Sequence, residues 1–236
     1  MSVEIRRERV CLKSGGPDSG RLRMAHLSDF HVWWSSRRLD EVAAILDEEQ
    51  PEVVVFTGDW FDTPRGADLC CDFLRRIAST RPVCWIRGNH DHWFGPEALE
   101  PFHGVSGAHC VDEMSWNFDS EWGLRCEFMS WQMHSTTARD SGRHRIVLVH
   151  DPEDLDLAKL PGCDLVLAGH LHGGQFVFHR TGSGTHFPAN MFYRWCCDRR
   201  EVDGVPVIIS RGLGDTLPLR FRCSHEVVMI EMGNGA

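Results

Sequence analysis

The chain has 236 residues, of which 42% are hydrophobic and 25% charged, and its formal net charge is -9. This length and apolar content allow a sizeable core, so we expect residues 1–236 to form a single domain, with residues 1–20 as an irregular segment or an edge strand. The acidic balance argues against a general nucleic-acid-binding protein, because such binding rewards a basic surface.

Targeting signals and membrane spans are not evident in the sequence. The first 19 residues mix charged residues with Gly and Pro and lack the apolar stretch of a signal peptide. No run of about eighteen apolar residues occurs, so no transmembrane helix is expected. We therefore expect a soluble, cytoplasmic protein. Its ten cysteines are expected to be free thiols, and the absence of a Cys-x-x-Cys pair argues against structural zinc.

Apolar runs along the chain predict strands that alternate with helices. Residues 53–56 are apolar at consecutive positions, as expected for a strand covered on both sheet faces. The region from about 102 to 142 has only a weak period. The other predicted strands are 21–29, 83–86, 146–149, 165–168, 207–209 and 227–230, and the predicted helical segments are 36–50, 70–77 and 152–160. This pattern indicates an α/β fold of two packed sheets with helices outside.

Polar runs end several of these apolar segments. Because ligands of open α/β sheets bind at the carboxyl ends of strands, we expect the runs to converge on one edge. Their carboxylate, amide and imidazole groups suit two divalent metal ions, with Mn expected first and Fe, Zn or Co as alternatives. The runs are Asp29-Phe30-His31, Gly58-Asp59-Trp60-Phe61-Asp62, Gly88-Asn89-His90-Asp91, His150-Asp151 and Gly169-His170-Leu171-His172.

The spacing within the runs suggests how the ligands are shared. An extended backbone would send Asp29 and His31 to one face, so both can hold the same ion. The same spacing separates His170 from His172, but a slight turn there would send one ring to each ion. Asp59 follows Gly58, which permits a close backbone approach, and its carboxylate is the natural bridge between two cations.

The order Asp-x-His, Gly-Asp-x-x-Asp, Gly-Asn-His-Asp, His and Gly-His-x-His resembles the calcineurin-like metallophosphoesterase superfamily across residues 29–172. The resemblance implies a four-layer α/β/β/α sandwich of two mixed sheets, with a dinuclear metal site at the carboxyl edge of the strands. One ion would be held by Asp29, His31, His172 and Asp59. The other ion would be held by Asn89, His150, His170 and Asp59.

The same resemblance implies a catalytic group beside the metals. His90 would be the catalytic histidine and Asp91 would orient it, while Asp62 would support the ligands or cap the next helix. Two cations about 3.5 to 4 Å apart would generate a bridging hydroxide that attacks a phosphodiester or pyrophosphate bond. His90 would stabilise the developing charge or protonate the leaving alkoxide, and pairing with Asp91 would raise its pKa toward that task.

Two later sequence blocks point to one branch of this superfamily. Residues 169–175 and residues 210–221 resemble the branch that includes membrane-associated phosphoesterases and a UDP-2,3-diacylglucosamine diphosphatase. This implies a lipid-linked nucleotide as the substrate and peripheral contact with a membrane. The aromatic segment 187–195, with arginines nearby, is a candidate for lipid or substrate contact, but it can also cap the core or form a dimer contact.

Two further residues are candidates for substrate binding, and other functions stay open. His92 directly follows the catalytic block, and Arg211 lies between a strand and a Gly-rich loop, where it can contact phosphate or form a salt bridge. The alternatives are a soluble phosphodiesterase of cyclic or linear nucleotides and a scaffold that has kept the fold without catalysis. Because none of the expected ligands is missing, we favour an enzyme.

Overall fold

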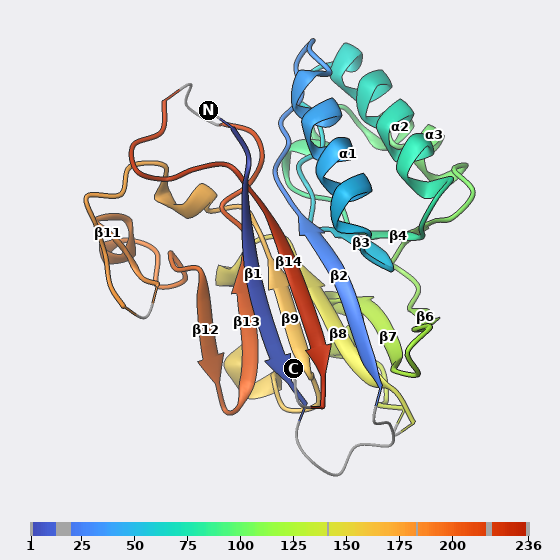
Figure 1. Cartoon of the computed structure of the whole chain (residues 1–236), viewed down its shortest axis with the longest axis vertical. Coiled ribbons are helices and arrows are strands. Elements are labelled where there is room, and N and C mark those ends of the chain that lie inside the picture. Colours follow the sequence, from blue (N-terminus) through green and yellow to red (C-terminus); the bar gives the residue numbers. More distant parts are fainter. Residues whose placement is uncertain (1, 13–19, 141, 183, 216–218, 235–236) are drawn as a thin grey trace.

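Two six-stranded sheets pack face to face at the centre of the computed structural model, which describes residues 2–12, 20–140, 142–182, 184–215 and 219–234 (Figure 1). The strand order of the first sheet is β1 (Glu4–Cys11), β14 (Glu226–Gly233), β2 (Arg21–Leu27), β3 (Val53–Phe56), β4 (Val83–Trp85) and β5 (Ala108–Cys110). In this sheet β2 to β5 are parallel, and β14 is antiparallel to β2 and parallel to β1. An edge strand thus occupies much of the described N-terminal segment, while residues 13–19 lie outside the described residues.

The second sheet is also mixed. Its four inner strands are parallel, and an antiparallel strand pairs at each edge. The order is β12 (Arg199–Val202), β13 (Val205–Ile209), β9 (Leu165–Ala168), β8 (His144–Val149), β7 (Arg125–Ser130) and β6 (Trp116–Asp119). The edge strand β6 is only partly buried, which explains the weak apolar period in this part of the sequence.

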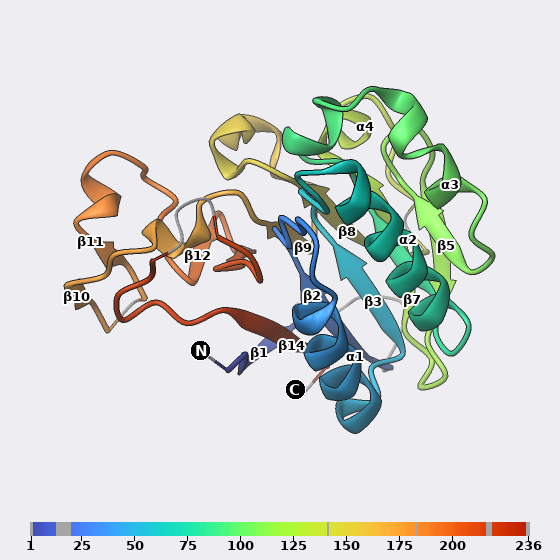
Figure 2. The same ribbon diagram turned by 90° about the horizontal axis from the view of Figure 1, so that it is seen from above.

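Helices cover the outer faces, so the predicted four-layer arrangement is confirmed. The helices α1 (Arg37–Glu49), α2 (Pro64–Ala78) and α3 (Glu100–His103) lie outside the first sheet (Figure 2). The cover on the second sheet is thinner and includes α4 (Trp131–His134) and the 3-10 turns η3 (Pro152–Asp154) and η4 (Leu157–Lys159). Within the described ranges, no helix combines the length and apolar character needed to cross a bilayer.

The core explains why the strand sequences are apolar at consecutive positions. Val53 and Val55 of β3 pack between the two sheets, whereas Val54 and Phe56 face the helices. Both faces of the strand are therefore covered, as the run of four apolar residues predicts. On α1, the buried side chains repeat with helical spacing, and they include Leu39, Val42, Ala43 and Leu46.

A small lobe projects to one side of the sheets (Figures 1 and 2). It contains the hairpin β10 (His179–Arg180) and β11 (His186–Phe187), followed by the 3-10 turn η6 (Ala189–Met191). The aromatic segment 187–195 is divided within it: Phe192 is 81% exposed and Met191 68% exposed, whereas Trp195 is only 1% exposed. The Trp195 ring packs in the hydrophobic core outside the second sheet, and the guanidinium groups of Arg194 and Arg200 approach it, so this indole is not part of a contact surface.

Candidate metal centre

The predicted ligands meet where strands of both sheets end. Asp29 and Asp59 follow β2 and β3 closely, while His150 and His170 follow β8 and β9. Three groups of ligand atoms result, and within each group the atoms lie within 4.8 Å of one another. The first cluster consists of Asp29, His31 and His172, and the second consists of Asp59, His150 and His170. The third group, His31, Asp59 and His90, joins these two clusters.

In the first cluster, the imidazoles of His31 and His172 face each other with their Nε2 atoms. Nε2 of His31 lies 3.1 Å from Nε2 of His172, and the latter lies 3.8 Å from Oδ1 of Asp29. On its other side, His31 Nδ1 lies 3.1 Å from Oδ1 of Asp62 and can donate to it. Burial lowers the pKa of His172 to about 4, so this imidazole is neutral at pH 7, the form that binds metals.

In the second cluster, a backbone carbonyl fixes the tautomer of a histidine. Nδ1 of His150 donates to the carbonyl oxygen of Thr57 at 2.7 Å, which turns Nε2 toward the cluster. That Nε2 lies 2.9 Å from Oδ1 of Asn89 and 3.1 Å from Nδ1 of His170. The amide oxygen of Asn89 therefore lies beside this group.

Asp59 lies between the two clusters. Its Oδ2 is 3.5 Å from Nε2 of His31 and 3.2 Å from Nε2 of His150. Its other oxygen accepts a hydrogen bond of 2.8 Å from the backbone N–H of His90. One carboxylate oxygen thus faces ligand atoms from both clusters, which is the position required of a bridging ligand.

The chemistry of these groups fits two divalent cations. Lone pairs of imidazole nitrogens and carboxylate or amide oxygens point at one another over short distances, and none of the cluster ligands is a thiolate. Burial alone would lower the pKa of His150, but Asp59 and Asp29 raise it to about 9. The pocket therefore favours a positive charge at this place, as a cation site must.

The ligands sit on unusual backbone. Asp29, His31, Asp59, His170 and His172 all have positive φ angles, between 46° and 68°. Such left-handed conformations are uncommon outside Gly and cost about 1–3 kcal/mol each. The expectation of an extended Asp29-x-His31 segment is therefore wrong: the two side chains converge because both residues are left-handed, not because they alternate along a strand.

Close approach of two loops requires glycine at the predicted position. Gly58 has a φ of 96°, and a Cβ placed there would lie only 2.5 Å from the backbone nitrogen of Gly88. Any larger residue would push the loops apart. Gly58 therefore holds Asp59 against the loop that carries Asn89.

The partner of His90 is Asp62, not Asp91. Nδ1 of His90 lies 2.7 Å from Oδ1 of Asp62, and the Trp93 ring packs on the imidazole with its centroid 3.7 Å away. Hydrogen bonds to His31 and His90 keep the pKa of Asp62 below its ordinary value, although burial opposes this shift. Thr63, not Asp62, caps α2. Asp62 therefore connects a ligand of the first cluster with the predicted catalytic group.

Asp91 instead joins the two loops. Its carboxylate is buried and accepts hydrogen bonds of 2.8 Å from the backbone N–H groups of Gly88, Asp59 and Trp60. Burial raises its pKa to about 7, against the effect of these donors. In the 3-10 turn η1 (His90–His92), consecutive side chains point in different directions, so Asp91 faces the core while His90 faces the ligands.

Arg211 and His92 contribute no atom to the ligand clusters. Arg211 is buried, and its Nε donates to Glu226 at 2.7 Å while its Nη2 lies 3.1 Å from an oxygen of Glu4. The predicted phosphate contact from Arg211 gains no support, because carboxylates of its own chain hold the guanidinium. The salt bridge weighed as the alternative is what the structure contains. His92 is exposed at the end of η1.

Arg220 is the arginine that approaches the ligands. Its Nη2 lies 3.2 Å from Nδ1 of His172, and its Nε donates to Asp215 at 2.6 Å. The sequence offers little to separate Arg220 from Arg211, since both lie in the Gly-rich region after β13. Only the three-dimensional path of this loop shows which guanidinium reaches the site.

Comparisons with known proteins agree with this geometry. The sequence model of the family described as calcineurin-like phosphoesterase matches residues 22–174. The uncharacterized metallophosphoesterase YkuE of Bacillus subtilis is 28% identical over 223 residues, covering 88% of this chain and 76% of the relative. The phosphodiesterase YaeI of Escherichia coli is 24% identical over 213 residues, covering 82% of this chain and 75% of the relative.

A solved structure supports the fold. A dimetal phosphatase from Danio rerio superimposes with a TM-score of 0.53 at 13% identity, over 84% of this chain and 89% of that chain. Taken together, the ligand clusters and the match over residues 22–174 establish that the chain belongs to the calcineurin-like phosphoesterases, a family of hydrolases with a dinuclear divalent metal site.

Proposed function

We propose that this protein hydrolyses a phosphodiester or pyrophosphate bond at the two ligand clusters. The observation that carries the proposal is the position of Asp59, whose Oδ2 faces His31 and His150 at 3.5 and 3.2 Å. Manganese is the first candidate for both ions. The proposed ligands are Asp29, His31, His172 and Asp59 for one ion, and Asn89, His150, His170 and Asp59 for the other.

The metals and the chain would divide the chemistry. When bound, two divalent ions acidify water, neutralise phosphate oxygens and orient the phosphate for attack. His90 would supply the proton for the leaving oxygen: its Nδ1 is held by Asp62, so Nε2 is the nitrogen left for the substrate. The Trp93 ring that packs on His90 restricts its rotation.

Turnover of bis-p-nitrophenyl phosphate tests the proposal. The metal-free protein should be inactive, and activity should return with two equivalents of Mn, measured alongside metal content by elemental analysis. His90→Ala should retain two metals and lose roughly a hundredfold in kcat, the usual contribution of one general acid. A folded, metal-loaded protein without turnover on any phosphate ester would favour the scaffold alternative.

Exposed aromatic side chains support a finer proposal about the substrate. In the small lobe, Phe178, Phe187, Phe192 and Tyr193 are all exposed. His186 connects this lobe to the loop that carries His172, since its Nδ1 donates to the carbonyl of Gly173 at 2.9 Å. We propose that the segment 187–193 contacts a lipid surface and that the substrate is a lipid-linked nucleotide.

Liposome sedimentation tests this finer proposal. The double variant Met191→Ser, Phe192→Ser should bind anionic vesicles more weakly than the parent protein, while Trp122→Ser, which removes an exposed indole elsewhere, should not. Turnover of UDP-2,3-diacylglucosamine should then be compared with that of cyclic nucleotides under the same metal conditions. Faster turnover of the cyclic nucleotides would favour the soluble alternative.

A further inference from the structure

A groove opens beside the first ligand cluster. Its volume is about 640 Å³, which lies within the range of about 300–1,000 Å³ typical of small-molecule sites. Residues 30–35 after β2, Arg38 of α1, residues 213–215 and His225 form its lining. His31 belongs both to this lining and to the ligand cluster. The lining residue Trp33 also contacts Asp62, which in turn contacts His31 and His90, so the groove lies next to the proposed metal centre.

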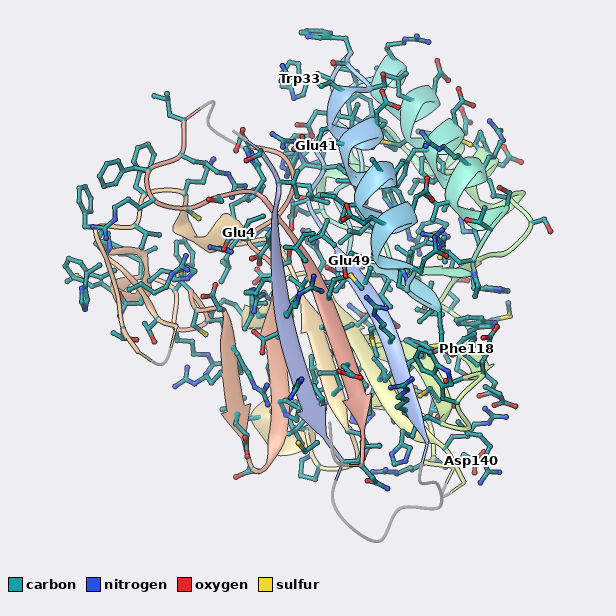
Figure 3. All side chains as sticks on the ribbon, in the orientation of Figure 1. Glu4, Trp33, Glu41, Glu49, Phe118 and Asp140 are labelled. Atoms are coloured by element: carbon teal, nitrogen blue, oxygen red, sulfur yellow. The ribbon has the colours of Figure 1, made fainter. Side chains whose placement is uncertain are left out.

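Two tryptophans form an exposed part of the groove wall. Trp33 is 49% exposed and Trp34 is 71% exposed, and their rings meet edge to face with centroids 5.2 Å apart. Figure 3 shows Trp33 projecting near the first turn of α1. Adjacent indoles exposed to water are unfavourable unless they cover an apolar or aromatic partner, so this pair indicates a contact surface.

Hydrogen bonds hold Trp33 in place. Its Nε1 donates to Oδ2 of Asp62 at 3.0 Å, and its backbone carbonyl accepts from the hydroxyl of Thr63. Asp62 also accepts from His90. The indole that lines the groove thus shares a carboxylate with the proposed acid, so the wall and the catalytic group are positioned together. Such a fixed aromatic surface binds a ligand with little loss of conformational entropy.

The charged side chains that line the described part of the groove have partners within the chain. Arg38 lies 3.1 Å from Glu41 and 3.2 Å from Nδ1 of His225. Asp215 accepts from Arg220 at 2.6 Å and from His225 at 2.8 Å. A ligand with a second phosphate or an ammonium group in the groove would have to displace these pairs, whereas an uncharged ring would not.

We propose that this groove is the subsite for a nucleobase carried by the phosphoester, a proposal that rests on the function proposed above. Indole faces stack on any base, because every base has a π-face, and the stacking requires no charge. Trp33 and Trp34 would contact the base while the metal centre holds the phosphate. An aliphatic chain is better matched to the exposed phenylalanines of the separate lobe around Phe192.

Equilibrium binding to the Mn-loaded protein tests the proposal without requiring turnover. Adenosine 5'-monophosphate, methyl phosphate and hexyl phosphate present the same phosphomonoester to the metals but differ in the group that reaches the groove. We expect the adenosine ester to bind roughly tenfold more tightly than methyl phosphate. Trp34→Ala should reduce that advantage to about twofold, because it removes a stacking face and keeps the hydrogen bond between Trp33 and Asp62.

Trp122→Ala is the matched control. Trp122 is also exposed, but it lies over the guanidinium of Arg21, 4.0 Å from it, at the start of β2. The ligands follow the other end of that strand, about 20 Å away. This variant should keep the full advantage of the adenosine ester. Trp33→Phe, which retains an aromatic face without the N–H, should keep most of it.

Three results would overturn the subsite: equal affinity for the adenosine and methyl esters, an equal gain with hexyl phosphate, or an unchanged advantage in Trp34→Ala. Turnover of bis-p-nitrophenyl phosphate is measured on the same preparations. Active protein without an adenosine advantage would refute the subsite alone. Inactive protein that still binds the adenosine ester more tightly through Trp34 would refute the proposed hydrolysis while retaining the base contact.

Discussion

The interior of the strands and the edge where they end differ in composition and in backbone conformation. All four residues of β3 are apolar and buried between the layers, yet three residues after its end Asp59 has a buried carboxylate and a φ of 61°. Apolar burial stabilises the interior, whereas left-handed backbone and buried charge destabilise the edge. The packed sheets therefore hold in place an edge whose geometry serves ligand binding rather than stability.

Asp59→Asn should produce the largest loss of activity at the edge with little effect on the fold. The amide removes the negative charge shared by the two clusters, so we expect kcat/KM to fall roughly a thousandfold, or about 4 kcal/mol of transition-state stabilisation. The free energy of unfolding of the metal-free protein should fall by about 1–3 kcal/mol, because His150 loses the charge of its partner; this is less than the cost of emptying a large core position. Phosphodiesterase assays and urea unfolding measure the two effects. A large loss of stability in the metal-free variant would contradict the division between edge and interior.

Phe128→Ala should show the reverse behaviour. Phe128 is fully buried between the sheets, and its removal leaves a cavity that should lower the free energy of unfolding by about 3–5 kcal/mol. Urea unfolding of the metal-free protein gives the value. At low temperature, where the variant remains folded, its metal content should match that of the parent. Loss of both metals from the folded variant would mean that packing in the interior also determines whether the edge can bind metal.

Asp62→Asn and Asp91→Asn form a matched pair within the edge itself. Asp62→Asn weakens the hold on His90 and His31, so kcat should fall by about 10- to 100-fold with little change in stability. Asp91→Asn leaves one oxygen to accept from three backbone N–H groups, so stability should fall by about 1–3 kcal/mol. If Asp91→Asn lowered kcat more than Asp62→Asn at unchanged stability, Asp91 rather than Asp62 would be the residue that orients His90.

The interior and the positions of the candidate ligands could be read from the sequence because both signals are local. An unbroken apolar run such as residues 53–56 requires cover on both faces, and α1 has its apolar residues at helical spacing. Polar donors directly after such runs lie at the carboxyl ends of the strands, where the ligand site of an α/β fold forms. For this reason the positions of Asp29, Asp59 and His150 were predictable without any knowledge of distances.

The partners of those ligands were not predictable, because they depend on backbone conformation. The family resemblance of the Gly-Asn-His-Asp block suggested Asp91 as the partner of His90, but the 3-10 turn at His90–His92 directs the two side chains apart. The carbonyl of Thr57 that orients His150 leaves no trace in the sequence. The sequence likewise could not show which of Arg211 and Arg220 approaches the ligands. That depends on a network of buried ion pairs in which Glu226 pairs with Arg211.

Acid should weaken that same network, with a smaller effect than any of the substitutions above. Burial alone would raise the pKa of Asp198, but His186 and the guanidinium groups of Arg6 and Arg211 lower it to about 2. Because the pKa is depressed in the folded state, the contribution is present above pH 4 and is lost as the pH falls toward 2. We expect it to be on the order of 1 kcal/mol. Between pH 5 and pH 2.5, Asp198→Asn should therefore lose less stability than the parent in urea unfolding, since it lacks a carboxylate to protonate there. Equal losses in both proteins would show that Asp198 does not link the lobe to β1 and to the loop after β13.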